Sequence, residues 1–275
     1  MKTNILRSLI IVATSCLGHV VSAQTLQDEK NIFRIEVGVM RQKTLDLQYS
    51  PRVYKSISPS LGFIYSREKK KGLFDVSLKL RTGSLSPSDG DLQSVYITDT
   101  DFDGNDGMEV HDLEYAQMSA ALEVGYLHHI VTHSKPRWFV GGSLVENFTY
   151  TPSIIYIGTI NYASLNLRGR MDYPLNNGKL LSLGISFPVL SVVTRMPYHN
   201  APIYPNKSGI GAFFTGNNEV VTMNSFQNES FFVRYQWFKS EKISMDVQYE
   251  SNWLYSKKPE RLTASYRQIS IGINL

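Results

Sequence analysis

The chain has 275 residues, of which 42% are hydrophobic and 19% are charged, and its formal net charge is +4. This length suits one large β domain or two average domains. The Lys and Arg residues are scattered without a long basic stripe, which argues against nucleic acid as a partner. The 16 Tyr, 13 Phe and 3 Trp residues fit either sheet packing or aromatic rings at a membrane–water boundary.

The N-terminus predicts a secretory signal peptide. Lys2 and Arg7 precede an apolar run from Leu9 to Val21, and Ala23 is a small residue of the kind that precedes a cleavage site. The run is too short to span a membrane comfortably, which disfavours an uncleaved anchor. We therefore expect Sec-type export and a signal peptide at residues 1–23, cleaved after Ala23.

The single cysteine, Cys16, lies inside this signal. Acylation of Cys16, as in a lipoprotein, is an alternative, but the preceding residues 13–15 do not match the usual Leu-led pattern. If cleavage follows Ala23, the mature chain has no thiol, and therefore no disulfide, cysteine–metal site or cysteine nucleophile.

Beyond the signal, apolar and polar residues alternate with the period of two that is typical of β-strands. The expected strands span approximately 32–41, 57–67, 72–82, 114–131, 136–149, 159–173, 179–194, 228–238, 242–254 and 263–275. Most are about ten residues or longer, which is long for a globular strand and right for a tilted membrane-spanning strand. No later apolar run approaches the length of a transmembrane helix.

The connections between these strands alternate in length. Short polar turns are expected at 68–71, 132–135, 174–178 and 239–241, and longer links at 42–56, 83–113, 150–158, 195–227 and 255–262. Outer-membrane barrels have short periplasmic turns and longer extracellular loops. With about ten strands, both chain ends fall on the short-turn side. Twelve strands are the alternative, if 44–51 and part of 83–98 or 212–225 form additional strands.

Charged residues inside the strands share one face, and the other face is apolar. The charged face carries Arg34, Glu36, Lys79, Arg81, Glu123, Arg168, Arg170, Asp172, Arg234, Asp246 and Glu250, with Asp75 as a further balancing charge. In a soluble sandwich these charges would face water, whereas in a membrane barrel they would line the lumen and form a charge network. The signal, the strand lengths and the loop asymmetry favour the barrel.

Aromatic residues gather near the expected strand ends, where amphipathic rings prefer to lie in a membrane. Those near the short turns are Tyr65, Phe74, Tyr126, Trp138, Tyr173 and Trp237, and those near the other ends are Tyr150 and Trp253. The sequence thus predicts an all-β fold, a transmembrane antiparallel up-and-down barrel at 32–275. A short periplasmic segment at 24–31 would precede it.

The last strand alternates Ile269, Ile271 and Ile273 up to Leu275. It resembles the C-terminal strand of outer-membrane barrel proteins, which is read by the barrel-assembly machinery, although such strands usually end in Phe. The whole mature chain resembles, in architecture, the uncharacterised outer-membrane barrels of Bacteroidota. That resemblance implies the cell outer membrane as the location and its lipid as a partner, and it carries over no functional residues.

An acidic stretch at 99–109 is a candidate calcium loop. Asp99, Asp101 and Asp103 are spaced like the first ligands of a calcium-binding loop, and hard oxygen ligands at this spacing can surround Ca²⁺. Glu109, however, comes one residue before the position where the bidentate Glu is expected, and no helices flank the loop. A solvated acidic loop is the alternative. No other cofactor is indicated.

Three further groups of residues suggest chemistry only weakly. His128, His129 and His133 cluster at an expected periplasmic turn, but neighbouring strand residues point to opposite faces and cannot readily share a metal. Asp101, Asp103, His111 and Asp112 in the 83–113 loop raise the possibility of a rim hydrolase similar to omptins. His133 and Ser134 raise that of a barrel phospholipase, but they lie at a turn expected on the periplasmic side. No second loop supplies a matching pair, so no catalytic residue is named and a non-enzymatic role is favoured.

A barrel of about ten strands is narrow, and its lumen should be filled mostly by side chains. We therefore expect a closed scaffold whose extracellular loops, near 83–113 and 195–227, bind a partner that the sequence does not identify. The alternatives are a narrow pore for small solutes and a hydrolase at the rim.

Overall fold

The computed structural model describes residues 30–89, 94–100, 106–112, 114–130, 135–151, 157–195, 213, 218–240 and 243–275. The expected signal peptide and Cys16 lie outside these residues and stay predictions. No helix among the described residues is long and apolar enough to cross a membrane.

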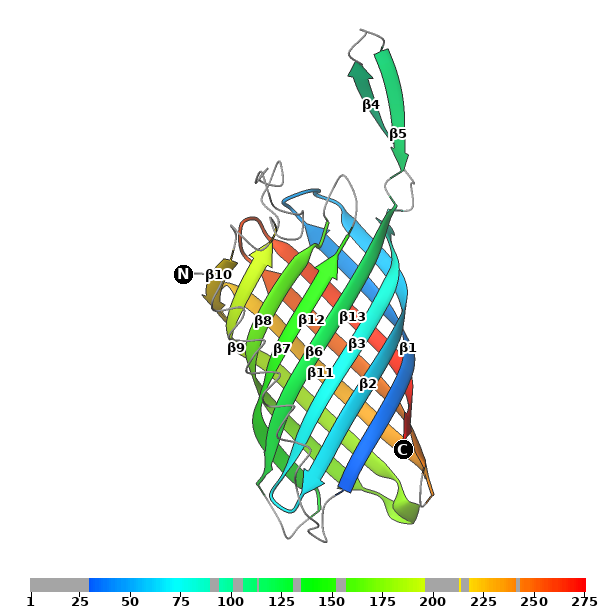
Figure 1. Cartoon of the computed structure of the whole chain (residues 1–275), viewed down its shortest axis with the longest axis vertical. Coiled ribbons are helices and arrows are strands. Elements are labelled where there is room, and N and C mark those ends of the chain that lie inside the picture. Colours follow the sequence, from blue (N-terminus) through cyan, green and yellow to red (C-terminus); the bar gives the residue numbers. More distant parts are fainter. Residues whose placement is uncertain are drawn as a thin grey trace.

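Ten antiparallel strands form a closed barrel (Figure 1). They are β1 (Lys30–Asp46), β2 (Val53–Lys69), β3 (Gly72–Pro87), β6 (Tyr115–His129), β7 (Arg137–Tyr150), β8 (Ile160–Pro174), β9 (Leu180–Arg195), β11 (Phe226–Lys239), β12 (Ser244–Ser256) and β13 (Leu262–Asn274). The ring closes where β13 pairs with β1, from Arg34 opposite Asn274 to Asp46 opposite Leu262. The expected ten-strand barrel is confirmed.

The two ends of the barrel differ, as the loop lengths predict. The β2–β3, β6–β7, β8–β9 and β11–β12 connections are short turns, and the barrel's chain ends, the start of β1 and the end of β13, lie at the same end (Figure 1). At this end Phe33 and Leu275 exchange both backbone hydrogen bonds, at 3.3 and 2.8 Å. We call this the short-turn end and the opposite one the long-loop end.

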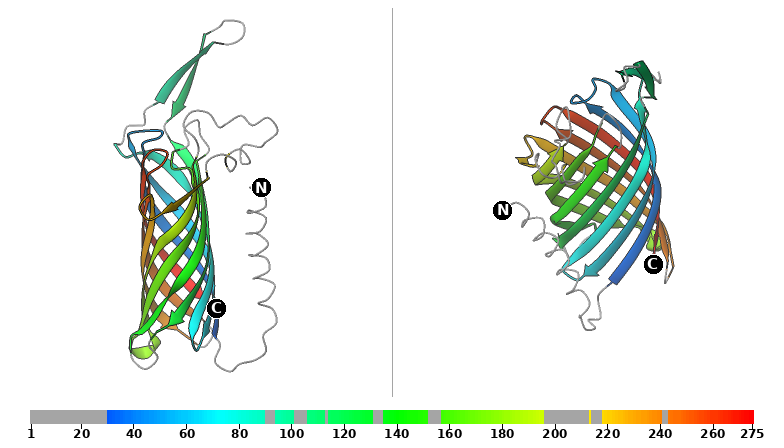
Figure 2. Two further views of the ribbon diagram at one scale, coloured as in Figure 1. Left: turned by 90° about the vertical axis from the view of Figure 1, so that its left-hand side faces the viewer. Right: turned by 45° about the horizontal axis from the view of Figure 1, so that its top comes forward.

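The alternative of twelve wall strands is wrong. β4 (Ser94–Thr100) and β5 (Asp106–Asp112) pair only with each other, and this hairpin projects past the barrel at the long-loop end (Figures 1 and 2). β10 (Asn218–Thr222) pairs with β9 and does not complete the ring. The expected 44–51 strand is partly the end of β1, which runs to Asp46.

Strand β9 contains an irregularity that reverses its side-chain alternation. Its first part, Leu180 to Ser186, pairs with β11. Its last part, Leu190 to Thr194, pairs with β10. The register with β8 also shifts here, and Val189 and Leu190 are both exposed. A bulge of this kind moves the following residues to the other face, which explains why Arg195 is buried inside the barrel.

The outer face of the barrel is a continuous apolar belt. It includes Val37, Val39, Ile57, Leu61, Leu78, Leu80, Leu122, Val124, Val140, Leu144, Leu165, Leu167, Ile185, Phe231, Tyr249, Ile269, Ile271 and Ile273, all exposed. Val37 is 62% exposed and Ile57 71%. Soluble monomers rarely expose apolar patches of more than a few hundred Å². The belt is therefore the lipid-facing surface of a transmembrane barrel.

Exposed aromatic rings border this belt. Tyr126, Trp138 and Tyr173 lie on the outer face close to the short-turn end, whereas Trp253 lies toward the long-loop end. Amphipathic rings favour the depth of the lipid headgroups, so these residues indicate the two membrane boundaries.

A glycine pair tests the packing of the wall. A Cβ at Gly141 of β7 would lie 2.0 Å from the Tyr126 carbonyl oxygen on β6, whereas at Gly169 of β8 it would only contact Ile185 at 3.5 Å. We expect Gly141→Ala to destabilise the barrel by about 1–3 kcal/mol through overpacking and Gly169→Ala to leave it nearly unchanged. Urea unfolding followed by heat-modifiable gel migration measures both. Equal urea midpoints for the two variants would contradict the strand register described here.

Candidate functional site

The lumen is filled in layers along its axis. An apolar cluster of Leu73, Leu127 and Phe139 lies at the short-turn end. Paired charges follow, then a small cavity, and then apolar side chains toward the long-loop end. This arrangement arises because every second residue of each strand points inward, so each inward residue occupies a defined height.

Arg34 of β1 is the centre of the first charged group. Its guanidinium donates to both carboxylate oxygens of Asp246 on β12, at 2.7 and 3.1 Å, and also pairs with Glu36. Asn274 donates a further hydrogen bond to Asp246, at 2.9 Å. Bidentate Arg–carboxylate contacts are the strong form of ion pair, and burial of both partners requires that they stay together.

A second group of paired charges lies on the opposite side of the lumen. Arg168 of β8 donates to Asp75 of β3 at 2.8 Å and lies 3.4 Å from Glu123 of β6. Arg170 makes a bidentate contact with Asp172, at 2.8 and 2.9 Å. Arg137 connects Asp172 to Glu68, at 3.4 and 2.6 Å. These contacts link β2, β3, β6, β7 and β8 through their side chains.

The remaining expected lumen residues lie nearer the middle of the barrel. Lys79 of β3 pairs with Glu250 of β12, and Arg81 donates to Gln268 of β13 at 3.3 Å. Arg234 of β11 stands opposite Gln248 and Ser182. The structure thus places all eleven residues of the expected charge network on inward-facing positions.

Sequence reasoning did not include Glu68, Arg137, Asp46 or Arg195 in this network. Each lies at or beyond an expected strand end: β1 was expected to stop at 41, and 195 to begin a loop. The alternation that places Arg34 and Glu36 inward continues to Asp46, and this signal could have identified it. Arg195 follows the β9 bulge, which the sequence pattern does not reveal.

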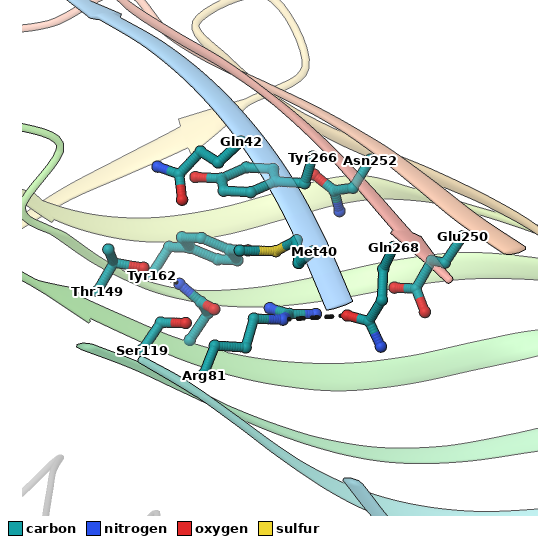
Figure 3. Close-up of a pocket in the computed structure, with 11 residues that line it drawn as sticks. Met40, Gln42, Arg81, Ser119, Thr149, Tyr162, Glu250, Asn252, Tyr266 and Gln268 are labelled. Atoms are coloured by element: carbon teal, nitrogen blue, oxygen red, sulfur yellow. Dashed lines mark hydrogen bonds between the residues drawn. The ribbon is translucent and has the colours of Figure 1, made fainter. Parts of the chain in front are cut away.

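A small cavity of about 30 Å³ lies above the charged layers. Figure 3 shows Tyr162, Tyr266 and Met40 on one side of it and Arg81 hydrogen-bonded to Gln268 on another. Its lining comprises Met40, Gln42, Arg81, Ser119, Asn147, Thr149, Tyr162, Glu250, Asn252, Tyr266 and Gln268. Most of these residues carry a polar group, and they come from several sides of the barrel.

Two apolar clusters fill the lumen toward the long-loop end. One contains Ile160, Tyr162, Val193, Phe226, Leu254, Leu262 and Ala264, and the other Tyr54, Leu85, Tyr115 and Ile157. The rings of Tyr162 and Phe226 lie 5.1 Å apart, and Asn228 donates to the Tyr162 hydroxyl at 2.9 Å. Together the clusters contain residues of eight of the ten wall strands, and they narrow the half of the lumen toward the long-loop end.

A buried ion pair crosses the mouth above these clusters. Arg195 of β9 donates to Asp46 of β1 at 2.6 Å, and the two side chains are 2% and 0% exposed. Asp46 also accepts a hydrogen bond from the Gly158 backbone at 2.9 Å, and Arg195 donates to the Lys258 carbonyl at 3.2 Å. Since β1 and β9 lie four strands apart in the ring, this contact ties loops from opposite walls together.

The candidate calcium loop coincides with the projecting hairpin. Asp99 lies on β4 opposite Gly107, and Glu109 lies on β5 opposite Ile97. Asp101 and Asp103 lie outside the described residues, so calcium binding stays a prediction. Among the residues that the structure describes, no group of three or more His, Cys, Asp or Glu side chains could hold a metal ion.

The histidine cluster is divided by the strand geometry. His128 is exposed on the outer face of β6 and His129 stacks on Phe139, with 4.8 Å between ring centroids. His133 lies outside the described residues. His111 and Asp112 are opposite Val95 and Ser94 in the hairpin.

Comparison with known proteins supports the fold class alone. No family model and no curated protein matches the chain. The outer membrane protease OmpT from Escherichia coli matches with a TM-score of 0.52 over 92% of this chain and 98% of its own, at 9% identity. The transport unit of the autotransporter AIDA-I from Escherichia coli matches over 92% of both chains, at 8% identity and a TM-score of 0.39.

The class of the protein follows from these observations: the chain has the fold of an outer-membrane β-barrel. The identity to OmpT is too low to transfer a function, and the expected resemblance to Bacteroidota barrels stays a prediction.

The first charged group provides a test of the lumen network. Arg34→Met would leave Glu36 and Asp246 buried without their cation, which we expect to cost about 3–5 kcal/mol. The variant Arg34→Met/Glu36→Gln/Asp246→Asn removes all three charges and should recover most of this loss. Urea midpoints of the folded gel band measure the effect.

Lys70→Met is the matched control, because Lys70 is an exposed cation in the β2–β3 turn. It should leave the midpoint unchanged. If Arg34→Met were equally harmless, the charged layer would not brace the wall.

The filled lumen predicts a barrel that does not conduct. Purified protein inserted in planar bilayers should give no steady current, because charged pairs, apolar clusters and the mouth ion pair occupy successive levels of the lumen. Gel migration of the same sample must show folded barrel, and a general porin serves as the positive control. Steady, reproducible channels would contradict a closed lumen.

Proposed function

We propose that this protein is an integral protein of the cell outer membrane that acts as a closed scaffold. Its long-loop end presents a binding surface to the outside. The observation that carries the proposal is the filled lumen: a barrel closed by paired charges and by two apolar clusters offers no wide route for solute. Its accessible chemistry is therefore concentrated on the loops.

The outer-membrane location is supported by the apolar belt and by the fold shared with OmpT. The predicted signal peptide would deliver the chain to the periplasm, where the barrel-assembly machinery would recognise the C-terminal strand. Both barrel chain ends then lie on the periplasmic side, as the short turns require. The long-loop end faces outward.

The hairpin of β4 and β5 is the main feature of the proposed surface. It forms its own two-stranded sheet and extends from the rim (Figure 1). An extended β-hairpin offers unpaired edge groups on both strands, which can recruit an added strand from a partner. Calcium, if the 99–109 segment binds it, would be held within this hairpin.

The test is the exposure of two inserted epitopes on cells. One epitope is placed between Thr100 and Asp106 in the hairpin, and a matched one between Lys70 and Lys71 in a short turn. Antibody should bind the hairpin epitope on intact cells and the turn epitope only after the outer membrane is permeabilised. Both variants must first show heat-modifiable migration.

The reverse pattern of labelling would contradict the proposed orientation. Inaccessibility of the hairpin epitope on intact cells would remove the proposed binding surface. Steady conductance in the bilayer experiment would instead favour the alternative of a narrow pore. No geometry among the described residues favours a rim hydrolase.

A further inference from the structure

Four exposed basic residues form a patch on the outside of the barrel. Arg41 and Lys43 lie on β1, Lys55 on β2 and Arg267 on β13. In the alternation of all three strands these positions face outward, away from the charged lumen. We call these four residues the basic patch.

The strand register brings like charges directly together. Arg41 is paired with Arg267 across β1 and β13, and Lys43 with Lys55 across β1 and β2. Directly opposite residues have Cβ atoms about 4.5–5.5 Å apart, and like charges at such positions are destabilising. Two repulsive pairs on three neighbouring strands are unfavourable unless an anion lies against them.

Among the described residues, the outer faces of these strands supply no such anion. None of the four side chains forms an ion pair or hydrogen bond with another described residue. The outward positions of β12, β13, β1, β2 and β3 contain no carboxylate. Glu229, an outward carboxylate on β11, stands opposite Trp253 of β12 and therefore lies two strands from β13.

The basic patch lies at a membrane boundary. On β1 the outward residues from Phe33 to Val39 are apolar, and Arg41 is the next. The step from Phe33 to Arg41 corresponds to about 20 Å along the axis at the usual rise and tilt, and such barrels have apolar bands about 25 Å tall. The patch therefore falls at headgroup depth in the leaflet at the long-loop end.

On the neighbouring strands the outward apolar residues end at the same height along the barrel axis. Ile269 is the next outward residue after Arg267 on β13, Ile57 is the next after Lys55 on β2, and Trp253 on β12 marks the same boundary. Elsewhere the boundary is not basic: Ser251 stands beside Arg267, and Glu146 is exposed on β7 across the barrel. A feature confined to β13, β1 and β2 indicates one site rather than a ring of interfacial cations.

From this geometry we infer that the basic patch binds the phosphate groups of an anionic lipid in the outer leaflet. The inference rests on the proposed outer-membrane insertion and orientation. Phosphate oxygens accept charge-assisted hydrogen bonds, and the guanidinium groups of Arg41 and Arg267 can bind them in a bidentate manner. Lys43 and Lys55 add charge that attracts anionic headgroups. The acyl chains of the lipid would lie on the Ile57 and Ile269 side of the patch.

Binding of lipid A, which carries phosphate monoesters on acylated sugars, to folded protein in neutral detergent tests the inference. Wild-type protein should bind it more tightly than dephosphorylated lipid A, and inorganic phosphate at high concentration should compete. The variant Arg41→Gln/Lys43→Gln/Lys55→Gln/Arg267→Gln should bind at least about tenfold more weakly. Lys70→Gln/Lys71→Gln, which removes two exposed cations at the short-turn end, is the matched control and should bind like wild type.

Stability distinguishes binding from a merely structural role. Without anionic lipid, the fourfold variant should be at least as stable as wild type because its repulsive pairs are gone. Lipid A should raise the urea midpoint of wild type and not that of the variant. The inference would be overturned if the fourfold variant bound lipid A as tightly as wild type does. It would also be overturned if wild type bound dephosphorylated lipid A as tightly as lipid A.

The proposed function is checked separately by gel migration in phosphatidylcholine vesicles. A wild-type chain that failed to insert there would contradict the proposed function itself. A chain that inserted normally but did not prefer phosphorylated lipid would contradict only the lipid site.

Discussion

Closure of the backbone hydrogen-bond ring is the constraint on which the rest of this structure depends. In lipid, an unpaired N–H or C=O group has no water to bind, so a spanning sheet must have no free edge. Here the contact between β1 and β13 removes the last edge, down to the paired backbone groups of Phe33 and Leu275. The apolar outer belt and the polar interior both follow, because each strand must then present alternate residues to lipid and to lumen.

The small circumference of the ring imposes a second condition on the interior. Ten strands leave space for side chains and little else, so inward charges cannot keep a full hydration shell and must be neutralised by one another. Arg34 with Asp246 and Arg168 with Asp75 meet this condition across different walls. Toward the long-loop end, tyrosine, phenylalanine and leucine side chains fill the lumen instead. Because the lumen is filled in this way, we place the proposed functions on the outer surfaces of the barrel.

Those surfaces face two different environments. In the orientation that we propose, the β4–β5 hairpin would stand clear of the membrane, where it could meet a macromolecule, whereas the basic patch would lie against the headgroups of the surrounding leaflet. The two proposals are physically linked, since a lipid held by β13, β1 and β2 would fasten the long-loop end at a defined height. The Asp46–Arg195 contact would hold the loops of opposite walls in place above it.

Alternation, strand length and loop length determined the barrel, its ten wall strands and the inward face of Arg34 or Glu250, because a period of two assigns a face without knowledge of neighbours. They did not determine which charges meet: Arg34 and Asp246 are 212 positions apart in the sequence, and only ring closure brings them together. The β9 bulge that buries Arg195, the separate pairing of β4 with β5, and the register that sets Arg41 beside Arg267 were likewise decided by tertiary structure, because each depends on how one strand pairs with another rather than on its own residues.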